Sequence, residues 1–297
     1  MLKKNIRLEH PRRNHMVGDG FRVSQYIPGY GREMSNETSP FLMLDYNAPW
    51  KIEPQSGGHR PGVGYHPHRG FETVTIVYSG QIEHQDTAGH GGVIGADEVQ
   101  WMTAGSGLLH NEFMTEEFAR MGGVQHVVQL WVNLPREHKM ATPHYQSLTR
   151  DMIPEVAIDG GRARVIAGNL QVKNEQGISI EQSGITKTFS PVELYDIRLE
   201  GVGKNILTFP EGYNAMILVV EGNIALNDKA LTNGDMIFLS QDGTEVQFVS
   251  DSPVKILVMA GKPLDEPVAA YGPFVMNTDI EIMQAFQNYR DGKMGEL

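Results

Sequence analysis

The chain has 297 residues, and its composition excludes several classes of protein before any motif is considered. It contains no cysteine, so disulfides, thiolate metal sites and a cysteine nucleophile are excluded. A formal net charge of -11 disfavours direct binding to nucleic acid, because that affinity depends on basic side chains that contact phosphates. No segment reads as a secretory signal or as a membrane span. We therefore expect a cytoplasmic protein without a membrane or nucleic-acid partner.

Strand patterns dominate the first half of the chain. A β-branched run over 72–78 ends at Ser79-Gly80 and is followed by alternating residues over 81–84, which predicts a β-hairpin. Further strands are expected over 99–103 and 124–133, since both are rich in strand-forming residues and bounded by turn signals.

Two short clusters of potential metal ligands lie in this strand-rich half. His66 and His68 are separated by one proline, and side chains two apart on an extended chain share a face. His110 and Glu112 repeat this spacing. Two adjacent strands that present two ligands each could surround one divalent ion with three nitrogens and a carboxylate, leaving coordination positions open for chemistry.

The second half repeats the strand pattern of the first. Segment 216–226 echoes 75–84 with a glycine at the same place, and 233–238 echoes 95–100. Such self-similarity indicates an internal duplication of a β-rich unit. Short strands at hairpin spacing, present in two copies, predict two small barrels or jelly rolls.

The repeat sets the expected domain boundaries. Residues 1–150 are predicted to form an N-terminal metal-binding domain, and residues 151–297 a C-terminal domain that ends in a helix. A capping box at Thr278 and Glu281 begins that helix, whose apolar face is expected to dock on a barrel. The second copy is expected to lack metal ligands, because the positions that correspond to the candidate ligands and to Glu72 hold Thr208, Pro210, Asn214, Phe248 and Ser250.

The sequence resembles the pirin family. The resemblance rests on four segments that extend over most of the chain, 66–75, 100–112, 129–135 and 272–278. Pirins belong to the cupin superfamily, so the resemblance implies an all-β fold of two stacked, jelly-roll-like cupin β-barrels with a short C-terminal helix. It also implies that only the N-terminal barrel holds a metal, usually iron.

The same resemblance implies that His66, His68, His110 and Glu112 are the metal ligands. This set suits Fe(II), with Mn, Co, Ni, Cu and Zn as alternatives, because ligand type discriminates weakly among these ions. Some pirins have quercetin 2,3-dioxygenase activity, which implies a flavonol substrate whose heterocyclic ring is opened by O2 with release of CO. We expect Glu112 to be a catalytic base as well as a ligand, taking the proton of the flavonol 3-hydroxyl.

Two residues outside the ligand set are expected at its margin. Glu72 is a candidate to line the site or to act behind the ligands, as a cupin-like carboxylate. His126 comes shortly before the strand-like segment 129–134 and could face the barrel interior.

Other pirins act as transcription cofactors or as partners of metabolic enzymes, and family membership does not choose among these roles. A metal-dependent regulatory or interaction protein with a protein partner is therefore the alternative hypothesis. A sugar isomerase or another cupin enzyme is a third.

Overall fold

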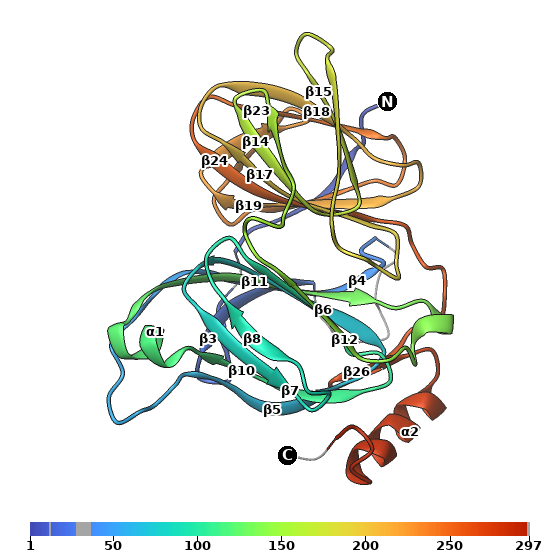
Figure 1. The fold of residues 1–297 in the computed structure, drawn as a ribbon. Helices are drawn as coiled ribbons and strands as arrows, with labels where there is room; N and C mark the ends of the chain where they lie inside the picture. Colours follow the sequence, from blue (N-terminus) through green and yellow to red (C-terminus); the bar gives the residue numbers. More distant parts are fainter. Residues whose placement is uncertain (12, 28–36, 296–297) are drawn as a thin grey trace. The chain divides into compact units, whose positions relative to one another are not determined.

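The computed structural model describes residues 1–11, 13–27 and 37–295. These residues form two compact units, each built mainly from β-strands (Figure 1). We call the first the histidine unit, which contains the described residues of 13–27, 41–150 and 265–295. The second unit contains the described residues of 1–11, 37–40 and 151–264. The predicted all-β class is confirmed.

The histidine unit consists of a large and a small antiparallel sheet. The large sheet has the strand order β12 (His144–Leu148), β9 (Val99–Thr103), β6 (Phe71–Ser79), β11 (Gly123–Asn133), β4 (Phe41–Ile52), β3 (Phe21–Ile27), β2 (His15–Val17). The small sheet has the order β5 (Gly62–His68), β10 (Leu108–Met114), β7 (Ile82–Asp86), β8 (Gly91–Ile94). The remaining elements are α1 (Glu116–Met121), the 3-10 turn η1 (Arg136–His138), the hairpin β25 (Ala269–Tyr271) and β26 (Phe274–Met276), and α2 (Asp279–Arg290).

The second unit has the same plan. Its large sheet has the order β1 (Asn5–Glu9), β22 (Met236–Leu239), β19 (Asn214–Glu221), β24 (Val254–Gly261), β17 (Val192–Leu199), β14 (Gly161–Ala167), β13 (Glu155–Ile158). Its small sheet has the order β16 (Ser179–Ser183), β15 (Asn169–Asn174), β18 (Gly203–Thr208), β23 (Glu245–Ser250), β20 (Asn223–Leu226), β21 (Lys229–Thr232). One apolar core between these sheets draws buried residues from both.

Equivalent turns in the two units support the predicted duplication. In the histidine unit, the amide of Asp97 donates to the carbonyl of Val77 at 2.7 Å. In the second unit, the amide of Gly234 donates to the carbonyl of Val219 at 2.8 Å. Both turns lie next to a central strand of a large sheet, and the strand orders of the sheets correspond.

The hairpin predicted around Ser79-Gly80 was wrong. Strands β6 and β7 do not pair, because β6 belongs to the large sheet and β7 to the small one. Val77 and Ile82, on either side of the turn, both pack in the apolar core between the sheets. Gly80, at φ +95°, lets the chain cross between sheets, a backbone conformation that side chains disfavour. Alternation of residues within two strands does not reveal whether the strands pair in one sheet or lie in two sheets that face each other.

The ends of the chain lie in different units from those expected. Strand β1 is the edge strand of the second unit, where it pairs with β22, although its residues precede the whole histidine unit in sequence. The hairpin β25–β26 and helix α2 belong to the histidine unit, not to a domain of residues 151–297. Long-range strand pairing places β1, and burial of the apolar face of α2 places the helix. The domain boundaries expected from the sequence took neither effect into account.

Helix α2 itself is confirmed. The amide of Glu281 donates to Thr278 Oγ1 at 3.2 Å, which caps the first turn as predicted. Ile282 and Ala285 are buried in a cluster with Leu109, which immediately precedes His110. The helix therefore packs beside a strand that carries candidate ligands.

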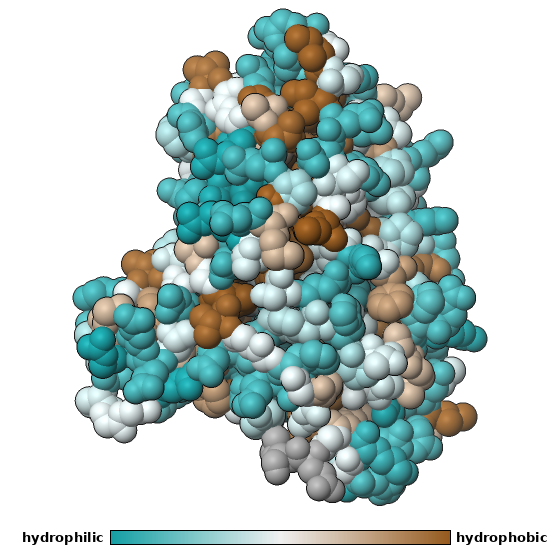
Figure 2. All heavy atoms as spheres, viewed as in Figure 1, coloured by the Kyte–Doolittle hydropathy of each residue, from teal (hydrophilic) through white to brown (hydrophobic). Residues whose placement is uncertain are grey.

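The face shown in Figure 2 is mostly hydrophilic, with hydrophobic residues in small groups. Within the described ranges, we find no helix of sufficient length and hydrophobicity to cross a membrane.

Candidate metal centre

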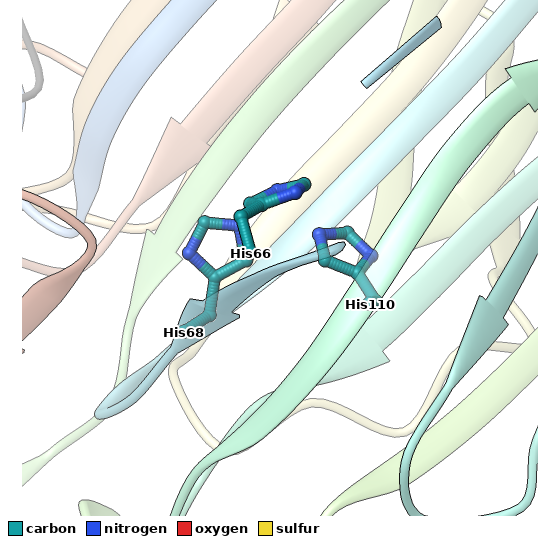
Figure 3. A group of neighbouring side chains, drawn as sticks. All are labelled: His66, His68 and His110. Atoms are coloured by element: carbon teal, nitrogen blue, oxygen red, sulfur yellow. The ribbon is translucent and has the colours of Figure 1, made fainter. Parts of the chain in front are cut away.

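Three of the predicted ligands converge in the histidine unit. His66 on β5 lies directly opposite His110 on β10, and His68 lies opposite Leu108. The ring centroids of the three histidines are 4.4 to 4.9 Å apart. One potential ligand atom from each of these rings lies within 4.8 Å of the others, and Figure 3 shows the rings grouped between the two strands. The alternation of the two strands thus brings together residues more than forty positions apart.

Glu112 lies near this trio but is held separately. The strand register shifts between His110 and Glu112, so that Glu112 lies opposite Val63. Its carboxylate oxygens accept hydrogen bonds from Gln129 Nε2 at 3.0 and 3.1 Å, and Thr75 Oγ1 lies 3.5 Å from one of them. The group whose ligand atoms lie within 4.8 Å of one another consists of the three histidines, without Glu112.

Backbone carbonyls orient two of the imidazoles. His66 Nδ1 lies 2.9 Å from the carbonyl of Gly64, and His68 Nδ1 lies 3.5 Å from the carbonyl of Pro273. A carbonyl oxygen can only accept, so each Nδ1 carries the hydrogen and each Nε2 is left with its lone pair. Histidines that bind metals commonly donate their second nitrogen in this way.

His110 has the opposite arrangement. It is fully buried, and neither of its ring nitrogens has a hydrogen-bond partner among the described residues. Leaving a buried polar atom without a partner costs about 1–3 kcal/mol, so a folded protein rarely tolerates it without a reason. A metal ion held between the rings would give the missing partner to one nitrogen.

The electrostatics favour the protonation states that metal binding needs. Burial lowers the pKa of His68 and His110 well below the usual range, and the neighbouring His66 lowers both further. These imidazoles are therefore neutral at pH 7, with lone pairs that a metal can use. The three histidines thus fit a divalent transition metal by donor type and grouping, and His68 and His110 do so by charge state as well.

The pKa of Glu112 is raised, whereas the pKa values of His68 and His110 are lowered. Burial raises the pKa of its carboxyl group, while His66 and the hydrogen bonds from Gln129 and Thr75 act in the lowering direction. A carboxylate whose pKa is raised accepts a proton more readily near neutral pH than an exposed glutamate does.

A small cavity of about 20 Å³, close to the size of one water molecule, lies on the inner side of the large sheet, and Glu112 forms part of its wall. Asp45, whose pKa burial raises to about 6, contributes a second carboxyl group. The other lining residues are Val17, Phe21, Val23, Asn47, Val63, Thr75, Val127 and Gln129. The cavity therefore combines an apolar surface with several hydrogen-bonding groups, but it is far smaller than a typical small-molecule site.

The structure does not bring Glu72 and His126 to this site. On β6, Thr75 faces Glu112, so Glu72 points to the other face of the sheet, where it accepts a hydrogen bond from Thr103 at 2.7 Å. His126 packs on that same far face, and its Nε2 lies 3.1 Å from the hydroxyl of Tyr46. Glu72 was expected near the site by resemblance to cupins, whereas alternation along β6 places it on the opposite face of the sheet from Thr75.

Three residues that the sequence analysis did not single out do face the interior. Gln129 and Thr75 hold the carboxylate of Glu112, as described above. His84, directly opposite Glu112 on β7, has its Nδ1 3.0 Å from Gln100 Nε2, and its Nε2 contacts the hydroxyl of Tyr145. Burial lowers the pKa of His84 to about 4, so it is neutral. The available signal was alternation: Thr75 and Gln129 each lie at the centre of a predicted strand with apolar neighbours.

The paired jelly-roll units, one of which carries the converging histidines, define a bicupin. Comparison with protein families identifies it further. Residues 20–132 match the pirin family model, and residues 194–295 match the model of the pirin C-terminal cupin domain. The chain belongs to the pirin family, and the predicted cupin fold of both halves is confirmed.

Similar proteins span nearly the full length of the chain. A Pseudomonas aeruginosa protein provisionally named a quercetin 2,3-dioxygenase is 41% identical over 98% of both chains. A pirin-like protein of Solanum lycopersicum is 37% identical, with 94% of this chain and 88% of that one covered. The crystal structure of a quercetin 2,3-dioxygenase from Acinetobacter baumannii superposes with a TM-score of 0.90 and 42% identity, covering 100% of this chain and 99% of that one.

Proposed function

We propose that this protein is a metal-dependent dioxygenase that opens the heterocyclic ring of flavonols such as quercetin with O2 and releases CO. The observation that carries the proposal is the trio of partly exposed His66 with buried His68 and His110, in which His110 has no other partner for its ring nitrogens within the described chain. The names of the Pseudomonas and Acinetobacter relatives support the substrate class.

In this proposal, His66, His68 and His110 hold the metal, with Glu112 as the fourth ligand. Iron(II) is the expected ion, and Mn, Co, Ni, Cu or Zn are the alternatives, since three imidazoles and a carboxylate suit several of these ions. When bound, the metal supplies Lewis acidity, which lowers the pKa of a coordinated hydroxyl, and a charge that favours the electron-rich anion reacting with O2.

Glu112 takes the proton of the flavonol 3-hydroxyl. It is suited to this role because it lines the cavity, and in the metal-free protein burial raises the pKa of its carboxyl group. The Gln129 amide donates to both carboxylate oxygens, which fixes the plane of the acid and keeps it from turning away from the cavity. The protonated acid can then return the proton to the ring-opened product.

The cavity is smaller than a flavonol, so in this proposal its walls move apart to admit the substrate. Phe21, Val23 and Val127 offer apolar surface to flat rings, while Asp45 and Asn47 offer hydrogen-bonding groups. The apolar walls would also limit the access of water to the substrate anion, which strengthens the interactions made around it.

Oxygen uptake and CO release with quercetin test the proposal directly. Iron-loaded wild-type protein is expected to turn over quercetin well above the rate of free iron, and His66→Ala is expected to lose that turnover. His144→Ala, which removes an exposed histidine of the same unit, is the matched control and should retain turnover. Unchanged turnover in His66→Ala would refute the assignment of the site.

A protein that binds metal but turns over no flavonol would favour the alternative of a regulatory or interaction protein. Recovery of a metal-dependent protein partner would then be the informative experiment. The cytoplasmic location and the absence of nucleic-acid or membrane partners stay predictions from the sequence.

A further inference from the structure

The last segment of the chain contacts the metal centre and residues next to it. We call residues 265–295 the C-terminal arm; it comprises β25, β26, α2 and the residues that follow α2. The sequence pattern assigned this arm to the other domain, yet it belongs to the histidine unit. Its contacts with the ligand-bearing strands occur at three separate places.

The first contact is with His68 itself. Pro273, in the turn between β25 and β26, directs its carbonyl oxygen at His68 Nδ1 from 3.5 Å. At this distance the hydrogen bond is weak, but it selects the tautomer that leaves Nε2 with its lone pair. Lys139 Nζ donates both to the carbonyl of Val275 at 2.9 Å and to that of Gly70 at 2.8 Å, which ties the hairpin to the segment that follows His68.

The second contact is made by Arg69, which is buried and follows His68 directly. Its carbonyl accepts from the amide of Val275 at 3.0 Å, and its Nε donates to the carbonyl of Ser106 at 2.7 Å, in the turn before β10. When the Asn288 amide is turned so that its oxygen faces Arg69, that oxygen accepts from Nη1 and Nη2 at 3.1 and 3.2 Å. Arg69 thus joins the segment of His68, the turn that leads to His110, and helix α2.

The third contact fixes the strand position next to His110. Thr87 Oγ1 donates to the carbonyl of Met294 at 2.7 Å and accepts from the amide of Leu109 at 2.9 Å. One hydroxyl therefore joins the end of the arm to the residue before His110. The side chains of Leu109 and Met294 also pack in one cluster with Ile282 of α2.

We propose that the C-terminal arm positions the metal ligands, with Arg69, Asn288 and Thr87 as the positioning residues. The proposal rests on the metal site of the proposed function. Since the arm contacts both ligand-bearing segments from outside, its docking fixes the spacing between His68 and His110. Metal binding and arm docking are then coupled, because each favours the same arrangement of β5 and β10.

Titration of the metal-free protein with Ni²⁺, monitored by calorimetry, measures this coupling without a turnover assay. Asn288→Ala removes the acceptor for Arg69, and Thr87→Val removes the hydroxyl with little change of shape. Each is expected to weaken Ni²⁺ binding by about tenfold to a hundredfold, the usual effect of removing groups that orient metal ligands. Asn288→Asp restores an acceptor for the guanidinium and should bind Ni²⁺ as the wild type does.

The matched control is Met283→Ala, an exposed position on α2, which should leave Ni²⁺ affinity unchanged. Wild-type affinity in both Asn288→Ala and Thr87→Val would overturn the positioning role while leaving the metal site intact. Equal weakening by Asn288→Ala and Asn288→Asp would also overturn it, because a general disturbance of α2 would then explain the loss. Failure of the wild type to bind Ni²⁺ would overturn the proposed function together with this inference.

Discussion

Replacing His110 with leucine should have opposite effects on the metal-free and metal-loaded protein. The side chain is fully buried, and both ring nitrogens are without hydrogen-bond partners among the described residues. Unpartnered buried polar atoms cost about 1–3 kcal/mol each, whereas a hydrophobic replacement of similar size costs less than about 1.5 kcal/mol. The metal-free His110→Leu protein should therefore be at least as stable as the metal-free wild type, to within about 1 kcal/mol.

The metal-loaded proteins should differ in the other direction. A ligand at a hundred times its Kd stabilises the folded state by about 2.7 kcal/mol, which is a rise in Tm of about 4 °C for a 297-residue chain that unfolds in one transition. The wild type should show this rise with Ni²⁺, and His110→Leu should not. Thermal unfolding of both proteins with and without Ni²⁺ measures the four values.

A matched control separates the site from general effects of losing a histidine. His144→Leu changes an exposed residue on β12 and should keep the full metal-induced rise in Tm. The reasoning fails if metal-free His110→Leu is more than about 2 kcal/mol less stable than the wild type, because His110 would then have a structural role that its missing partners do not suggest. It also fails if the variant keeps the Ni²⁺-induced rise.

Three further predictions concern carboxyl groups and the metal. Burial raises the pKa of Glu72 from 4.5 to about 7, so the folded protein binds the extra proton and loses stability as the pH rises from about 4.5 to 7. Glu72→Gln should therefore be more stable than the wild type above pH 7, by up to about 3 kcal/mol, and similar to it near pH 4. Denaturant unfolding across this range measures the slope of the unfolding free energy against pH. Equal slopes for the two proteins would contradict the prediction. Glu112→Gln should lower flavonol turnover by about 10²–10⁴-fold, as expected for loss of a general base. Oxygen uptake measures this turnover once the metal content of the variant is verified. Wild-type turnover in the variant would exclude Glu112 as the base. Chelation should abolish turnover and added Fe(II) should restore it, while restoration by Zn²⁺ alone would argue against a redox role for the ion.

Much of the fold follows from patterns that are local in sequence. The strand over 99–103 and the cap of α2 at Thr278 were both predictable, because strand-forming residues between turn signals and a capping box determine structure within a few residues. The duplication was also visible, since the glycines at 80 and 222 occupy the same place in two similar segments. Pairing between strands was not, and the predicted hairpin at Ser79-Gly80 shows why: alternation fixes which face a residue occupies, not which strand lies beside it.

The candidate site was likewise predictable from the sequence only in part. The sequence determined that His66 and His68 share a face and that His110 and Glu112 repeat the spacing, because side-chain alternation is a property of any strand. Only the tertiary structure decided that β5 and β10 are neighbours, that Glu72 points to the far face of its sheet, and that the C-terminal arm packs behind the ligands. These facts depend on contacts between residues far apart in the chain, which are selected by burial of apolar surface in the folded protein and leave no local signal in the sequence.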